Sequence, residues 1–207
     1  MLKQGNKYSV AILLVLGVLS QSVYFKKLSD VKAAATKVFN AADYARKYLK
    51  AQLIPAAKAA PQADQLIPML KNSPGKAFKT YAHGLDIGNI RFFMVQGDGV
   101  VTSVDENDVY VLTKDKQTLK IAIEYVFGNA LRDAPGIIDI KDFANTMDLN
   151  NIAAAVDKII RDEVLPPFRS QVKKGDNISF AGAFELNQEH INLANIEVIP
   201  VVLKINK

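Results

Sequence analysis

The sequence predicts a mainly β protein with some α: an N-terminal membrane helix, a short helical segment, and then an OB-like Greek-key barrel. Three observations support this fold class. An unbroken apolar run lies near the N-terminus, helical spacing gives way to short alternating runs near residue 87, and one amphipathic helix falls between the third and fourth expected strands. An open α+β sheet is the alternative, because residues 90–104 can be counted as one bent strand or as two.

Residues 1–28 have the pattern of a signal anchor or a signal peptide. Lys3 and Lys7 precede the apolar residues 8–25, and two lysines follow them. The length of the apolar run favours an uncleaved anchor that spans the bilayer, and cleavage near residues 20–22 is the alternative. We therefore expect residues 8–25 to bind the membrane, in a single-pass inner-membrane protein with its body in the periplasm.

Residues 29–76 are expected to form a helical adaptor beside the barrel. Apolar residues recur at helical spacing across residues 31–54, where Asn40 can cap the second half and Pro55 is expected to end the helix. A second helix is expected over residues 61–70, with residues 72–74 as its stop signal.

Residues 77–207 are expected to form the barrel domain. Leu119, Ile121 and Ile123 alternate with polar or small residues, which is the period of a strand with one solvated face. Residues 114–117 are expected to form a hairpin turn. The expected strands are residues 90–96, 99–104, 109–113, 118–126, 178–184 and 196–205.

One amphipathic helix is expected before the last two strands. Ile152, Val156 and Ile160 lie on its apolar face, which is expected to pack against one end of the barrel, while Asp157 falls on the opposite, solvated face. The expected boundaries are residues 149–164, with Asp148 as N-cap and Pro166-Pro167 as the stop.

The composition excludes several kinds of site. The chain has no Cys, and therefore no disulfide, thiolate nucleophile or lipid-bearing Cys; two histidines, His83 and His190, are too few for a hydrolytic zinc site. No cofactor is expected, because residues 97–99 (Gly-Asp-Gly) lack the strand–helix context of a phosphate loop and are expected to form a turn or bulge. The net charge of +5 is dispersed among acidic residues, so no nucleic-acid partner is expected.

One segment concentrates groups that can either bind a ligand or hold the chain in place. Asn129, Arg132 and Asp133 lie between two glycines, and Asp142 and Asn145 follow. An Arg fork there can clamp a carboxylate or a pair of sugar hydroxyls, oriented by the neighbouring Asp and Asn. The same Arg and Asp can instead bond to nearby backbone and staple the loop to the barrel. These five residues are the candidate binding or structural loop.

Several short motifs occur in an order that is more specific than any one of them. They are Asp43-Tyr44-Ala45, Gly97-Asp98-Gly99, residues 128–134, residues 142–145, Gly182-Ala183-Phe184 and Ile199-Pro200-Val201. In this order they resemble a bacterial domain-of-unknown-function family described as predicted periplasmic lipoproteins. The resemblance implies an envelope location and, since members are often encoded beside sugar ABC-transporter genes, an accessory role in solute handling, but it supplies no reaction. This chain lacks the lipobox Cys, so a peptide anchor is expected instead.

The first hypothesis for function is a non-enzymatic accessory or binding protein with no catalytic residues. Such a protein binds an envelope protein partner or a small polar solute at the candidate loop. The second is a carbohydrate-active enzyme that uses two of Asp133, Asp139 and Asp142 as acid and base. That enzyme requires two carboxylates facing one cleft.

The third hypothesis is single-stranded nucleic-acid binding by the barrel. It requires exposed aromatic rings on the strands, for which Phe92, Phe93 and Tyr110 are the candidates, and a basic groove. The envelope address and the scattered charges both count against it, and the three rings are expected to belong to the core.

Overall fold

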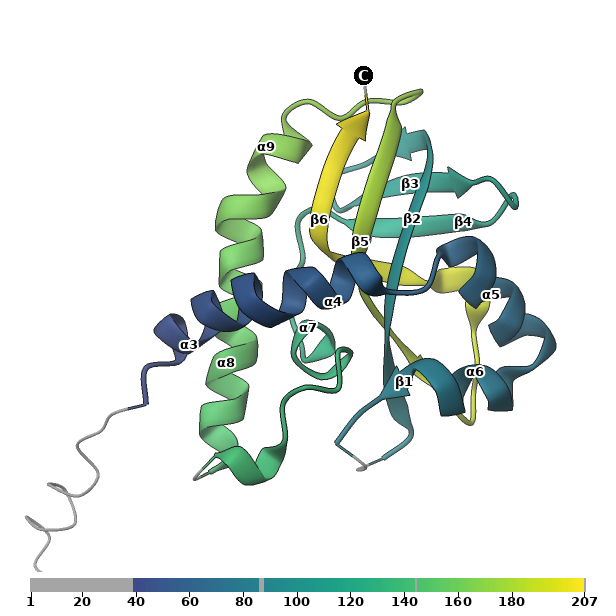
Figure 1. The fold of residues 1–207 in the computed structure, drawn as a ribbon. Helices are drawn as coiled ribbons and strands as arrows, with labels where there is room; N and C mark the ends of the chain where they lie inside the picture. The colour runs from purple at the N-terminus through teal and green to yellow at the C-terminus, as the bar shows by residue number, and fades with distance from the viewer. Residues whose placement is uncertain (1–38, 86–87, 144, 207) are drawn as a thin grey trace, which may run out of the picture. The chain divides into compact units, whose positions relative to one another are not determined.

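The computed structural model describes residues 39–85, 88–143 and 145–206 (Figure 1). Five strands close into a barrel in the order β2, β3, β4, β6, β5 and back to β2. Neighbouring strands are antiparallel, except that β4 and β6 are parallel. The strands are β2 (Ile90–Val104), β3 (Asp108–Thr113), β4 (Thr118–Ala122), β5 (Asn177–Asn187) and β6 (Glu197–Asn206), and the short β1 (Ala82–His83) pairs beside β2.

This topology confirms the predicted OB-like barrel with a helix between its third and fourth strands. The open sheet is wrong, because β2 pairs with β5 and closes the ring. Residues 90–104 are one strand that pairs with β5 as far as Val100 and with β3 from Gly99 onward. The Gly-Asp-Gly segment therefore lies within β2 and is not a turn. A Cβ at Gly99 would lie 2.5 Å from Val111 Cγ1, so glycine allows β3 to approach closely there.

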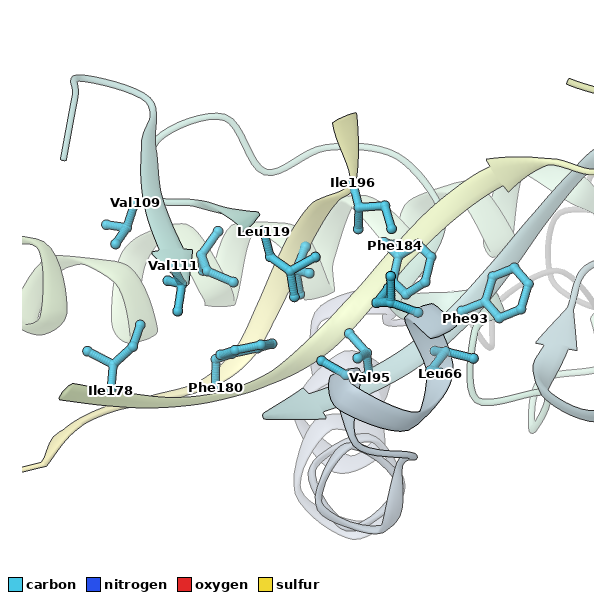
Figure 2. Close-up of a cluster of buried hydrophobic side chains, with 14 of the residues drawn as sticks. Leu66, Phe93, Val95, Val109, Val111, Leu119, Ile178, Phe180, Phe184 and Ile196 are labelled. Carbon is cyan, nitrogen blue, oxygen red and sulfur yellow. The ribbon is translucent and has the colours of Figure 1, made fainter. Parts of the chain in front are cut away.

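Apolar side chains from all five strands fill the barrel interior (Figure 2). Phe93 and Phe184 lie opposite each other on β2 and β5, and their rings stack with centroids 5.2 Å apart. Leu66, labelled in Figure 2, enters the same cluster from a helix outside the barrel. Phe168 enters it from another such helix. Inside the ring of hydrogen-bonded strands, side-chain packing and the exclusion of water therefore stabilise the barrel.

Two long helices continue past prolines that the sequence predicts as helix ends. The π-helical turns η1 and η3 each end two residues before a proline, so the predicted stops at Pro55 and at Pro166-Pro167 are wrong. Proline lacks an N–H and clashes with the carbonyl four residues earlier, and the extra residue of a π-turn relieves that clash. The segments are α3 (Ala41–Tyr48), η1 (Leu49–Leu53) and α4 (Ile54–Ala59), and α8 (Thr146–Ile159), η3 (Ile160–Val164) and α9 (Leu165–Arg169).

Helices α4, α5 (Ala63–Asn72) and α6 (Pro74–Tyr81) contact β2 of the barrel, whereas α3 packs against α8 (Figure 1). Asn40 caps α3 as predicted, because its Oδ1 accepts from the Asp43 N–H at 3.1 Å. Pro74 begins a further helix instead of ending the helical region. That further helix is α6, and α5 contributes to the barrel core. The boundary between adaptor and barrel at residue 76 stays a prediction.

The helix between β4 and β5 buries its predicted apolar face, including Ile152 and Val156. However, α8 itself packs against α3 and α7, and only its continuation, η3 and α9, contacts strand β6 of the barrel. The predicted packing of the helix against the barrel therefore holds only for its last turns. Asn145, not Asp148, is the N-cap: its Oδ1 accepts from the Asp148 N–H at 2.9 Å. The strand before this connection, β4, ends at Ala122 and not at the predicted residue 126.

No helix within residues 39–85, 88–143 and 145–206 is both long and apolar enough to cross a membrane. The predicted anchor at residues 8–25, and the whole of the predicted segment 1–28, lie outside the described residues.

Candidate functional site

The connection from β4 to α8 carries the candidate residues, and we call residues 125–143 the connecting loop. It contains a short helix, α7 (Ala130–Asp133), and a 3-10 turn, η2 (Ile140–Asp142). Every residue from 130 to 134 is buried, which is unusual for a connection between a strand and a helix. Polar groups in this stretch must therefore find partners within the protein.

Arg132 and Asp133 form a buried ion pair in α7. Arg132 Nε donates to Asp133 Oδ1 at 2.6 Å, and Nη2 donates to Oδ2 at 2.9 Å. The two side chains are 2% and 3% exposed. Arg132 Nη1 also lies 3.5 Å from Oδ1 of Asn150 in α8. Both carboxylate oxygens of Asp133 are therefore engaged inside the protein, in the bidentate geometry that Arg favours.

Tyr48 of α3 holds the backbone of the same short helix. Its hydroxyl lies 3.1 Å from the carbonyl oxygens of both Leu131 and Arg132 and donates to them. Burial, reinforced by the charge of Asp133, raises the pKa of Tyr48, so the hydroxyl keeps its proton. The contact joins α3 to the connecting loop across more than eighty residues of sequence.

His83 of β1 holds the loop just after α7. A carbonyl oxygen can only accept, so His83 Nδ1 donates to the Ala134 carbonyl, at 2.8 Å. Gly136 lies beside the ring with a φ of +65°, and a Cβ there would come within 2.4 Å of His83 Cδ2. Glycine is thus required at this position for two reasons, its backbone conformation and the space it leaves.

The structure separates the five predicted site residues. Arg132 and Asp133 are buried, whereas Asn129, Asp142 and Asn145 are exposed. Asn129, Arg132 and Asp133 line one pocket of about 310 Å³, together with Glu185 of β5 and apolar residues of β2. The other two residues do not line it; Asn145 is the cap of α8, and Asp142 ends η2.

A second pocket, of about 450 Å³, borders the other side of the connecting loop. His83, Arg91, Asp139 and Lys141 line it, and it shares Asp133 with the first pocket. Asp139 is itself used within the loop, where its Oδ1 accepts from the Lys141 N–H at 2.9 Å.

A third pocket, larger than the other two, was not predicted, and we call it the aromatic pocket. It has a volume of about 570 Å³ and lies between the start of the connecting loop and the β5–β6 connection, and it shares Glu185 with the first pocket. Tyr125 and Phe127 line one part of it, with exposed fractions of 61% and 64%. Two features of the sequence could have indicated it: two aromatic residues on either side of Val126, and a stretch rich in Asn and Gln at residues 187–195.

Asp157 of α8 is buried, contrary to its predicted position. It is predicted on the solvated face of the helix but is only 4% exposed. Burial raises its pKa to about 7, although the charges of Arg161 and Arg132 act in the opposite direction. The prediction fails because α3 and α7 both pack against α8, so more than one face of that helix is covered.

The catalytic hypothesis requires two carboxylates facing one cleft, and the nucleic-acid hypothesis requires exposed aromatic rings on the strands. Asp133 and Asp139 line the same pocket, but Asp133 is paired on both oxygens with Arg132. Phe92 and Phe93 are buried and cannot stack on bases, and Tyr110 is half-buried. Within the described ranges, no three His, Asp or Glu side chains are grouped so as to bind a metal ion.

The closed barrel, with its helix between the third and fourth strands, places the described part of the chain in the class of OB-fold proteins. The crystal structure of an OB-fold protein from Thermotoga maritima is similar, with a TM-score of 0.72 and 25% sequence identity over 81% of this chain and 99% of that one. The model of the family DUF2291, predicted periplasmic lipoprotein, matches residues 13–204, and the chain belongs to this family. The family name indicates a periplasmic location. No curated protein matches the chain.

Proposed function

We propose that the chain is a non-enzymatic binding protein, tethered to the inner membrane through residues 8–25, that takes a small polar solute at the surface bordered by the connecting loop. An accessory role in the uptake of such a solute, a sugar among them, is part of the proposal. The periplasmic location that the family name indicates is consistent with this role.

One observation carries the proposal: the connecting loop is fixed from inside and borders three pockets that share residues. The buried Arg132–Asp133 pair, together with Tyr48 and His83, holds its backbone in place. A loop ordered before binding loses little conformational entropy when a ligand arrives. The three pockets have volumes of about 310, 450 and 570 Å³, which suit small molecules.

A binding role is favoured over catalysis because of the state of the candidate carboxylates. Both oxygens of Asp133 already accept from the Arg132 guanidinium, which favours the ionised carboxylate over one that exchanges a proton, and Asp139 caps its own turn. A paired acid and base would need two carboxylates free to exchange protons with a substrate.

Binding can be tested on the full-length protein in lipid nanodiscs. Neutral mono- and disaccharides, amino acids, spermidine and glucose 6-phosphate are presented in turn, and saturation-transfer NMR detects the bound solute. We expect one class to bind and to be recovered unchanged by mass spectrometry. Chemical conversion of a solute contradicts the non-enzymatic part. If no class of solute binds and a second protein copurifies in stoichiometric amount, the ligand is a protein partner and not a solute.

The tether can be tested separately by fractionation and mass spectrometry. Because residues 10–19 carry no charge and lysines flank the apolar segment, the protein should stay with membranes during alkaline carbonate extraction. The intact mass should include residues 1–22. A mature N-terminus at Val23 and a soluble product would show that the segment is a cleaved signal.

A further inference from the structure

The aromatic pocket has a wall with two exposed aromatic rings. Val126 is fully buried, and the side chains on either side of it, Tyr125 and Phe127, are turned outward into the pocket. Arg161 donates from Nη1 to the Val126 carbonyl oxygen, and its guanidinium carbon lies 4.6 Å from the centroid of the Phe127 ring. The outward position of Phe127 is therefore held by Arg161, while buried Val126 directs Tyr125 to the same side, and exposed rings provide flat apolar surfaces for a ligand.

The opposite wall provides hydrogen-bond donors from the β5–β6 connection. Asn187 Oδ1 accepts from the N–H groups of Glu189 and His190, at 2.9 and 3.2 Å, and Asn192 Oδ1 accepts from the Ala194 N–H at 3.1 Å. These bonds determine the positions of Oδ1 and Nδ2 in each amide, because only the oxygen can accept from an N–H group. Among the described residues neither Nδ2 group has a partner, so both amides offer N–H donors at the pocket.

Hydrogen-bond acceptors are supplied by two carboxylates, Glu185 on β5 and Glu197 on β6. No Lys or Arg is among the residues that line the pocket; Lys120, beside Glu197 on β4, offsets part of one charge from outside it. The lining is therefore net negative and disfavours phosphates, carboxylates and nucleic acids. An ammonium group suits the carboxylates but not the amide donors, because both would be donating. A hydroxyl group suits both, since it donates to a carboxylate and accepts from an amide.

We propose that the aromatic pocket binds a neutral polyhydroxylated ligand, a mono- or disaccharide, whose apolar ring face lies on Tyr125 or Phe127 and whose hydroxyls bond to the Asn amides and Glu carboxylates. This proposal rests on the proposed binding function and specifies its ligand class and its site. The two exposed rings, the oriented amide donors and the two carboxylates all lie on one pocket, and together they match this class of ligand.

The decisive variant is Asn192→Asp. Asp keeps an oxygen that accepts from the Ala194 N–H, so the turn is preserved, but it replaces the outward N–H₂ donor by an acceptor. Saccharide affinity should fall roughly tenfold, as for the loss of one hydrogen bond. A polyamine ligand would instead bind more tightly, so the sign of the change separates the two ligand classes.

The aromatic wall is tested by Tyr125→Ala, which should weaken saccharide binding by roughly tenfold, while Tyr125→Phe should leave it within about twofold. Met147→Ala is the matched control, because Met147 is equally exposed but lies on α8 and does not line the pocket. Affinities are measured by saturation-transfer NMR on the full-length protein in nanodiscs, since glycoside detergents would compete.

The outcomes distinguish this proposal from the proposed function. Saccharide binding that is weakened by Asn192→Asp and Tyr125→Ala but not by the two controls supports the site. Saccharide binding that survives both changes overturns the site. Binding of spermidine or glucose 6-phosphate instead of a saccharide overturns the ligand class and leaves the proposed function standing. Binding of no solute overturns both.

Discussion

The barrel interior and residues 130–134 of the connecting loop are both closed to solvent, yet different forces hold them. The barrel core is an apolar cluster with stacked Phe rings. The described residues include four buried polar or charged side chains, and three of them, Arg132, Asp133 and Asp157, lie in the connecting loop or in α8 beside it. The fold is thus specified by apolar packing, whereas the shape of the loop is specified by buried charges.

This difference has consequences for stability. Apolar packing depends little on pH or on any single partner, and it tolerates exchange between residues of similar volume. A buried ion pair recovers the cost of desolvation only while both partners are present and well oriented. The connecting loop should therefore respond sharply to single changes of charge that would have little effect on an exposed surface.

The largest expected effect is that of Asp133→Ala. It leaves the Arg132 guanidinium buried without its partner, and the free energy of unfolding should fall by about 3–5 kcal/mol. Chemical denaturation measures the change. The exposed Asp139→Ala is the control and should cost about 1 kcal/mol or less. Equal small losses in the two variants would mean that water reaches Arg132 and that the loop tolerates a change of charge as an exposed surface does.

The second prediction asks whether apolar packing can replace the charges. In the double variant Arg132→Met with Asp133→Leu, both charged groups are removed together, so neither is left unpaired. Stability should return to within about 2 kcal/mol of the starting protein. Single and double variants compared by denaturation form a cycle that isolates the pair. A double variant as unstable as Asp133→Ala would show that the loop needs the ion pair for its geometry.

The third prediction concerns pH and Asp157. Its folded-state pKa of about 7 lies above the ordinary value of 3.8, so the folded protein retains a proton that the unfolded chain releases. The stabilising contribution of this group is fully present below about pH 4 and is lost as the pH rises through 7. Asp157→Asn, which is neutral at every pH, should therefore raise stability at pH 8 by about 1–2 kcal/mol.

The same variant should have little effect at pH 4, where Asp157 is protonated in the folded protein. Thermal melting of both proteins between pH 4 and 8 checks this; Arg161 and Arg132, the latter paired with Asp133, are the charged groups that act on Asp157. A pH-independent difference between the two proteins would mean that Asp157 is ionised throughout this range.

The barrel could be predicted from the sequence because its signals are local. Alternation along residues 118–122 and the apolar face of α8 depend only on neighbouring residues and on one core. The same reasoning places Asp157 in solvent, because it counts a single buried face and cannot anticipate that α3 and α7 cover another. The prolines mislead for a related reason: their use as stop signals assumes an unbroken α-helical period, and η1 and η3 change it.

The aromatic pocket could not be predicted in the same way. Its walls come from residues 125–130 and 184–199, which the parallel pairing of β4 with β6 and the β5–β6 hairpin bring together. Tyr125 is assigned to a strand by its apolar neighbours, although β4 ends at Ala122. The candidate loop residues were recognisable as a group, but whether a charged group is buried depends on tertiary contacts such as that of Tyr48.

The smallest expected effect separates a structural from a binding role at Asn145. Its side chain accepts from the Asp148 N–H at 2.9 Å and donates through Nδ2 to Asp148 Oδ2 at 3.1 Å, at the exposed start of α8. Asn145→Ala should lower the free energy of unfolding by about 1 kcal/mol, the ordinary effect of losing an N-cap. Asn145→Ser restores a capping oxygen and should recover most of that loss. If Asn145 instead takes part in ligand binding, Asn145→Ser will recover stability but not affinity for the solute. Thermal melting and solute titration of the two variants distinguish these cases. We expect them to agree, because Asn145 borders none of the three pockets and both groups of its amide are already used within the helix cap.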